Sequence, residues 1–135
     1  EIAQVWANND PNEALAWAES LPRDTLTSAA DGITLQLARI DPTTTADWLS
    51  SLGDDPGLDS ARESFLYRIQ SSDPALALDS VPTLSDPGMQ RRHYLRILNR
   101  WNRSDQQSAS AWITRNAAAL PEDVVQHYSR PKEEQ

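Results

Sequence analysis

Arginines are the most concentrated chemically active side chains of this chain. Five of its 12 Lys and Arg residues fall within the 13 residues from position 91 to position 103. Four of them are spaced by four, four and three residues, and this spacing places them along one face of a helix. These four are Arg92, Arg96, Arg100 and Arg103. A guanidinium group donates paired hydrogen bonds to carboxylate or phosphate oxygens, so this face predicts a groove that binds acidic groups of a partner.

Two kinds of side chain extend this candidate site. Arg68 occupies the position equivalent to Arg100 one sequence repeat earlier, and Tyr67 or Tyr94 is expected to lie exposed nearby as an aromatic anchor for a partner. The predicted partner-binding residues are Arg68, Arg92, Arg96, Arg100, Arg103 and Tyr94. The alternative is a solvated face, or arginines that pair with acids of neighbouring helices, because the chain contains 20 Asp and Glu residues.

The remaining chemically active residues do not indicate catalysis. His93 and His127 come without the Cys, Ser or paired His that a zinc site or a catalytic group would use. The acidic residues Asp54, Asp55 and Asp59 lack the alternating ligands, turn glycine and terminal Glu of a calcium loop. With four glycines, the chain has neither a phosphate-binding loop nor a nucleophile elbow. The sequence therefore predicts a protein that is not an enzyme and that holds no metal or cofactor.

Composition narrows the class of partner. The formal net charge is −8 at pH 7, whereas proteins that bind nucleic acid usually carry an excess of cations. No segment approaches the roughly 18 consecutive apolar residues of a membrane span, and the absence of Cys excludes disulfides and thiolate metal sites. We therefore expect a protein or peptide partner that carries acidic groups, and we expect neither nucleic acid nor direct insertion into a membrane.

These residues belong to a sequence that repeats itself. Asp-Pro pairs begin at positions 10, 41 and 73, and a degenerate copy, Asp105-Gln106, follows at the same interval of 31 or 32 residues. Seven residues after each Asp stand Trp17, Trp48, Ser80 and Trp112, and four residues before each Asp stand Trp6, Leu37, Ile69 and Trp101. A fixed period of this length is typical of stacked helical units. Because the tryptophans fall on repeat positions, packing between helices is favoured over an exposed ligand platform.

Each repeat predicts a hairpin of one short and one long helix. An Asp before a Pro starts a helix, because its carboxylate accepts hydrogen bonds from free backbone N–H groups and Pro lacks the N–H that would go unpaired. A second capping position recurs at Asp24, Asp55 and Asp86. Short helices are predicted from each Asp-Pro pair to about residues 20, 51 and 80, and again over 106–116. Long helices are predicted over 24–39, 56–71 and 87–103, with a weaker one over 121–129.

Apolar residues at helical spacing support this assignment. In the third long helix the apolar stripe consists of Tyr94, Ile97 and Trp101, and similar stripes recur one and two repeats earlier. A single hairpin could not bury such a stripe alone, so neighbouring units must stack against it. The predicted fold is all-α, a right-handed α-solenoid of about four helix-hairpin repeats with a period of 31–32 residues.

The segment from Trp6 to Pro22 has the pattern W-x3-D-P-x2-A-L-A-W-x3-L-P. This pattern resembles the Asp-Pro/Trp helical repeats of bacterial envelope and exported proteins, and it is more broadly similar to tetratricopeptide-type and HEAT-type solenoids. The match to the tetratricopeptide pattern is incomplete, because the period is not 34 residues and the expected Gly and Tyr of the first helix are missing. The resemblance implies a location in the bacterial periplasm or cell envelope, and it carries no catalytic residues.

We expect a single domain over residues 1–130 followed by a disordered tail over 131–135. Its units are predicted at 1–8 (partial), 10–39, 41–71, 73–103 and 105–130. The start in the middle of a unit predicts a processed protein or a segment of a longer one. The predicted function is a non-catalytic module that binds a protein or peptide partner on its concave face. Two alternatives stay open: a structural spacer or scaffold segment of a larger repeat protein, and an accessory helical domain of a bacterial envelope enzyme.

Overall fold

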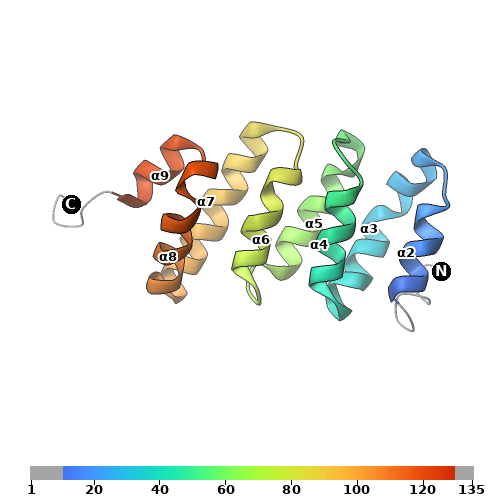
Figure 1. Ribbon diagram of the computed structural model, residues 1–135, viewed down its shortest axis with the longest axis horizontal. Coiled ribbons are helices and arrows are strands. Elements are labelled where there is room, and N and C mark those ends of the chain that lie inside the picture. The colour runs from blue at the N-terminus through green and yellow to red at the C-terminus, as the bar shows by residue number, and fades with distance from the viewer. Residues whose placement is uncertain (1–10, 130–135) are drawn as a thin grey trace.

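The computed structural model describes residues 11–129, and the regular structure in this range is entirely helical. Two rows of helices lie against each other along the long axis of the molecule (Figure 1). The first row consists of α2 (Pro11–Glu19), α4 (Pro42–Ser51), α6 (Pro74–Ser80) and α8 (Gln106–Asn116). The second row consists of α3 (Arg23–Ile40), α5 (Asp59–Ile69), α7 (Pro87–Ser104) and α9 (Glu122–Ser129). We call these the first-row and second-row helices.

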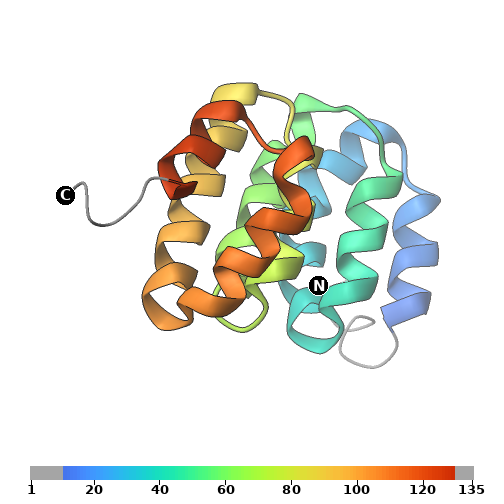
Figure 2. The same cartoon turned by 60° about the vertical axis from the view of Figure 1, so that its left-hand side comes forward.

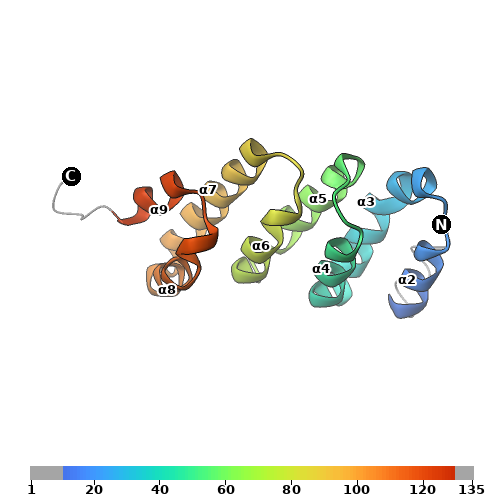
Figure 3. The same cartoon turned by 45° about the horizontal axis from the view of Figure 1, so that its top comes forward.

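The helices follow one another in chain order, so that α2 and α9 lie at opposite ends (Figures 1 and 3). Figure 2 brings forward the C-terminal end, where α7 and α8 pack side by side and α9 follows. Three 3₁₀ turns lie between successive α-helices of the described range, at Pro56–Leu58, Val81–Thr83 and Ala117–Ala119. The predicted alternation of a short and a long helix is present in α2–α3 and α6–α7, whereas α5 (11 residues) barely exceeds α4 (10 residues) and α9 (8 residues) is shorter than α8 (11 residues). A 3₁₀ turn replaces the first turn of the helix expected over 56–71.

The repeated Asp residues start the first-row helices, as predicted. Asp41, Asp73 and Asp105 each accept a hydrogen bond of 3.1 Å from the backbone N–H three residues later. The backbone N–H and the hydroxyl of Thr44 hold the pKa of Asp41 below its ordinary value, and the hydroxyl and backbone N–H of Ser108 do the same for the pKa of Asp105. The carboxylates of Asp41 and Asp105 are thus hydrogen-bonded in their charged form.

The second capping position follows the prediction at two of its three sites. Asp55 and Asp86 each accept a hydrogen bond of 2.9 Å from a backbone N–H of the turn that they start. The expected cap at Asp24 is wrong, because α3 already begins at Arg23 and Pro22 takes the cap position. Two residues of the repeat pattern lie outside the described residues: Trp6 and Asp10.

The core lies between the two rows and contains the repeat tryptophans. Trp48 and Trp112 are each 4% exposed, and Trp17 and Trp101 are partly buried against the same core. The side chains that are buried below 2% exposure include Phe65, Ile33, Leu37, Leu58, Leu66, Ile69, Leu78, Ile97, Leu98, Val81 and Val124. The described tryptophans therefore pack between helices and do not form an open platform.

One charged side chain, Arg62, lies in this core at 2% exposure. Its Nη2 donates hydrogen bonds to the carbonyl oxygens of Leu49 (2.5 Å) and Gly53 (2.8 Å), at the C-terminal end of α4. Gly53 has a positive φ of 77°, which glycine adopts without strain. Burial lowers the pKa of Arg62, while the negative end of the α4 dipole favours its charge. Arg62 therefore ties α5 to the end of the preceding helix.

Trp48→Ala is expected to lower the free energy of unfolding by about 3–5 kcal/mol, because removal of a buried ring leaves a cavity that the neighbours fill only in part. Trp48→Phe is the matched control. The Nε1 of Trp48 is buried and has no hydrogen-bond partner among residues 11–129, so Phe loses apolar contact but none of the described hydrogen bonds and should cost clearly less. Urea denaturation followed by circular dichroism measures both changes. A loss below about 1 kcal/mol for Trp48→Ala would place the ring at the surface.

Candidate functional site

The five predicted arginines lie on two neighbouring second-row helices. Arg68 belongs to α5, and the other four belong to α7. Four of them are exposed and one, Arg96, is partly buried; the exposed ones are Arg68, Arg92, Arg100 and Arg103. We call these five residues the arginine surface. None of the five forms a salt bridge with a carboxylate anywhere in residues 11–129. Within these described residues the pairing alternative therefore has no support, and a solvated face stays as the alternative to a binding surface.

Two other arginines of the second row do pair with acids. Arg23 of α3 forms a salt bridge of 2.8 Å with Asp55, and Arg91 of α7 forms one with Asp123 of α9. Each of these pairs joins elements one repeat apart, and the arginine lowers the pKa of the Asp123 carboxyl through a hydrogen bond. Arg91, although part of the arginine-rich segment, therefore contributes to a different contact from its neighbours.

Long polar side chains fill the space between α5 and α7. α3 packs closely along α5, whereas the backbones of α5 and α7 approach each other at few positions. The side chains that bridge this wider spacing make a connected set of polar and aromatic contacts. We call this set the seam cluster, and its members are Glu63, Tyr67, Gln70, His93 and Arg96.

His93 is the buried centre of the seam cluster, at 2% exposure. Its Nε2 lies 2.7 Å from Oε2 of Glu63, and its Nδ1 lies 2.5 Å from Nη1 of Arg96. Because a guanidinium group only donates, Nδ1 accepts from Arg96, and the neutral ring carries its hydrogen on Nε2 and donates it to Glu63. Burial lowers the pKa of His93 and the Arg96 charge acts in the same direction, against the hydrogen bond to Glu63.

Arg96 connects this buried centre to the surface. Its Nε donates to Oε1 of Gln70 at 2.9 Å, and its guanidinium carbon lies 4.2 Å from the ring centroid of Tyr67. The Tyr67 side chain is 55% exposed. Since His93 and Gln70 hold the Arg96 guanidinium in place, and burial lowers its pKa, Arg96 supports the exposed Tyr67 ring and is not a free contact residue.

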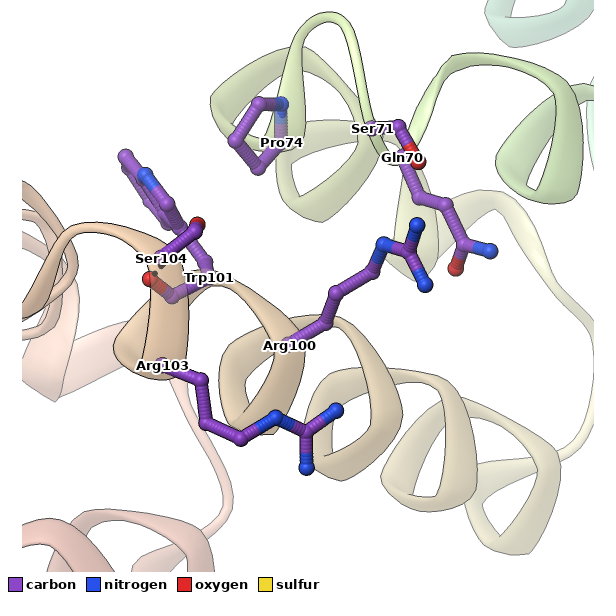
Figure 4. Close-up of a pocket in the computed structure, with 7 residues that line it drawn as sticks. All are labelled: Gln70, Ser71, Pro74, Arg100, Trp101, Arg103 and Ser104. Carbon is purple, nitrogen blue, oxygen red and sulfur yellow. Dashed lines mark hydrogen bonds between the residues drawn. The ribbon is translucent and has the colours of Figure 1, made fainter.

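Two open hollows flank the seam cluster. The larger, of about 380 Å³, lies between the end of α7 and the turn from α5 to α6 (Figure 4). We call it the arginine pocket, and it is lined by Gln70, Ser71, Pro74, Arg100, Trp101, Arg103 and Ser104. In Figure 4 the side chain of Arg100 extends toward Gln70, whereas the side chains of Arg103 and Trp101 leave α7 in other directions. The pocket therefore presents two guanidinium groups beside neutral hydrogen-bonding side chains.

The smaller hollow, of about 300 Å³, lies between α3 and α5 and is lined by Leu35, Ser64, Tyr67 and Arg68. Leu35 is 44% exposed, which makes it one of the few large apolar side chains at the surface of residues 11–129. We call this smaller hollow the apolar hollow. Tyr67 belongs both to this hollow and to the seam cluster, and Gln70 belongs both to the seam cluster and to the arginine pocket. The chain of contacts from Tyr67 through Arg96 to Gln70 therefore joins the two hollows.

The expectation that Tyr94 lies exposed as an aromatic anchor is wrong. Its side chain is 4% exposed and packs in the core on the side of α7 that faces α6 and α8, and burial raises its pKa. The physical reason is its spacing, since Tyr94 lies one helical turn before Ile97 on the apolar stripe. Tyr67, the other tyrosine considered, occupies the exposed position beside the arginines.

The residues of this site that escaped the sequence prediction include Leu35, Glu63 and Gln70. The sequence assigned no catalytic or metal-binding role to His93, and the structure gives it buried polar contacts. A signal for such contacts exists, because side chains about 26–32 residues apart meet across neighbouring second-row helices. The pairs with this separation are Arg23 with Asp55, Ser60 with Asp31, Ser85 with Asp59, His93 with Glu63, Arg96 with Gln70, Arg91 with Asp123, and Tyr128 with Asn99.

Comparison with known proteins gives no relative for this chain. No protein-family model matches it, and neither a curated protein nor a solved structure matches it. The likeness to Asp-Pro/Trp repeats therefore rests on the sequence pattern alone. None of the helices in the described range combines the length and apolar content needed to cross a membrane. His and acidic side chains of residues 11–129 do not gather in groups of three that would hold a metal ion.

The neutral state of His93 predicts a pH dependence of stability. Because burial lowers its folded-state pKa below the ordinary 6.5, the unfolded chain binds this proton more readily than the folded chain. The free energy of unfolding should therefore decrease as the pH falls through about 6.5, and this contribution should level off below the folded-state pKa.

His93→Gln keeps a hydrogen-bond donor and acceptor but does not titrate, so it should remove this contribution. Urea denaturation of both chains over a series of pH values isolates the contribution of His93, because the other titrating groups are shared. Parallel pH curves for the two chains would contradict a buried neutral histidine.

Proposed function

We propose that this chain is a non-catalytic α-solenoid module that binds an acidic segment of a protein partner through its arginine surface. The observation that supports this most directly is the lack of carboxylate partners for Arg68, Arg92, Arg100 and Arg103 within residues 11–129. The chain has a formal net charge of −8, so acidic side chains are abundant. Guanidinium groups that stay unpaired under this condition are available for carboxylates of another molecule.

The grouping of these arginines on one part of the molecule gives the proposal its geometry. Exposed ion pairs contribute little affinity one at a time, so binding requires several charges acting together and an apolar contact beside them. The arginine pocket is lined by two arginines. The exposed Tyr67 ring is connected to it by Arg96, which contacts both this ring and the pocket residue Gln70. This combination suits fast, electrostatically guided association with an acidic partner.

The spacer and accessory-domain alternatives need only stacked helices. Either role is compatible with the two rows of helices and with the buried core. Neither gives a reason for unpaired arginines to collect on α5 and α7 around an exposed tyrosine. We therefore favour partner binding over both, because four exposed arginines of the arginine surface lack carboxylate partners within residues 11–129.

The proposal predicts that Arg100→Glu strongly lowers the amount of a partner that is captured from a lysate of the source organism. Loss of one charge-assisted hydrogen bond lowers affinity by about tenfold or more, and the new carboxylate also repels an acidic partner. Arg115→Glu is the matched control, because Arg115 is exposed on the first-row helix α8, away from the arginine surface. Quantitative mass spectrometry compares the captured proteins.

A partner retained by wild type and Arg115→Glu but lost by Arg100→Glu supports the proposal. Capture that is equal for all three chains contradicts it. Circular dichroism of each variant checks that the helical fold is intact before capture is compared.

A further inference from the structure

The arrangement of the two hollows carries information about the partner, given that the arginine surface binds one as proposed above. The apolar hollow exposes Leu35 and the Tyr67 ring, and neither is needed for the core. The arginine pocket exposes Arg100 and Arg103. Two surfaces of different chemistry, joined through Arg96, favour a ligand that presents both an apolar side chain and carboxylates.

We propose that the partner segment is an extended acidic peptide that places one bulky apolar side chain in the apolar hollow and a carboxylate in the arginine pocket. The carboxylate would accept hydrogen bonds from the guanidinium groups of Arg100 and Arg103. The apolar side chain would cover Leu35 and the face of Tyr67 that Arg96 does not occupy. Recognition thus requires both features within one short segment.

The spacing of the two features follows from the helices. The hollows lie about one helical turn apart along α5, a rise of about 5–6 Å, and on opposite sides of this helix, whose diameter with side chains is about 10 Å. An extended peptide covers about 3.3 Å per residue. The apolar residue and the carboxylate are therefore expected about two to four residues apart in the partner.

Seam-cluster contacts explain why Tyr67 can serve as a fixed platform. The guanidinium of Arg96 lies 4.2 Å from its ring centroid, and the ring edge meets His93, with 5.6 Å between the two centroids. Arg96 is itself held by hydrogen bonds to Gln70 and His93. An exposed aromatic ring that is already held in place loses little conformational freedom when a ligand covers it.

Fluorescence anisotropy with three labelled peptides tests this proposal on the full chain. The first peptide has Leu and Glu separated by two to four residues in a Gly-Ser background with further Glu residues. The second has Ser in place of Leu, and the third has Gln in place of every Glu. The first is expected to bind at least roughly tenfold more tightly than either of the others, the effect of burying one apolar side chain or pairing one carboxylate.

Two surface variants assign each preference to its hollow. Leu35→Gln should abolish the preference for the Leu peptide over the Ser peptide and leave the preference for Glu over Gln. Arg100→Gln should do the reverse. Both residues are exposed, so both variants are expected to fold, and circular dichroism checks this. If each variant abolishes only its own preference, the two-point arrangement is supported.

Several outcomes overturn this inference while leaving the proposed function in place. In the first, the Leu and Ser peptides bind with equal affinity. In the second, no peptide binds although capture from a lysate still depends on Arg100. Two further outcomes overturn the choice of an acidic peptide. One is tighter binding of a single-stranded oligonucleotide than of the first peptide. The other is self-association of the chain in analytical ultracentrifugation, in which a second copy blocks the site. Lysate capture that is independent of Arg100 overturns both proposals.

Discussion

Burial of apolar side chains between the two rows of helices is the interaction on which the rest of the structure depends. One hairpin has no neighbour to cover its apolar stripe, so each unit relies on the next. The Asp caps set where the first-row helices begin, and Trp48 and Trp112, seven residues after such a cap, are both buried. The same register leaves Arg68 and Arg100, five residues before a cap, exposed. The placement of the arginines is thus a consequence of how the core is built.

Much of the helical layout could be predicted from the sequence, because local chemistry determines it. An Asp followed by a Pro caps a helix wherever it occurs, and Asp41 and Asp73 show the same hydrogen bond. Where local signals compete, prediction failed: Pro22 takes the cap position that Asp24 was expected to fill. Tyr94 carried two conflicting predictions, and its apolar-stripe spacing was the correct guide, because position on a helix determines burial more strongly than residue type does.

The candidate site could be predicted only in part, because it depends on distances between helices. The run of arginines was visible in the sequence, but their lack of carboxylate partners in residues 11–129 depends on where the acids lie. The wider spacing between α5 and α7 admits a buried histidine and the Arg96 side chain, which no local pattern indicates. This buried hydrogen-bond network then fixes the orientation of the exposed Tyr67 ring. A packing detail of the core thereby shapes the surface that we propose as the binding site.

The binding surface on α5 and α7 is tested most directly by an NMR titration that observes the side-chain Nε–H groups of the arginines while the Leu- and Glu-containing peptide is added. We expect selective shifts of Arg68, Arg100 and Arg103, with Arg23 and Arg91 unchanged in their salt bridges. Shifts that are absent, or that are equal for all arginines of the chain, would contradict a binding surface on α5 and α7.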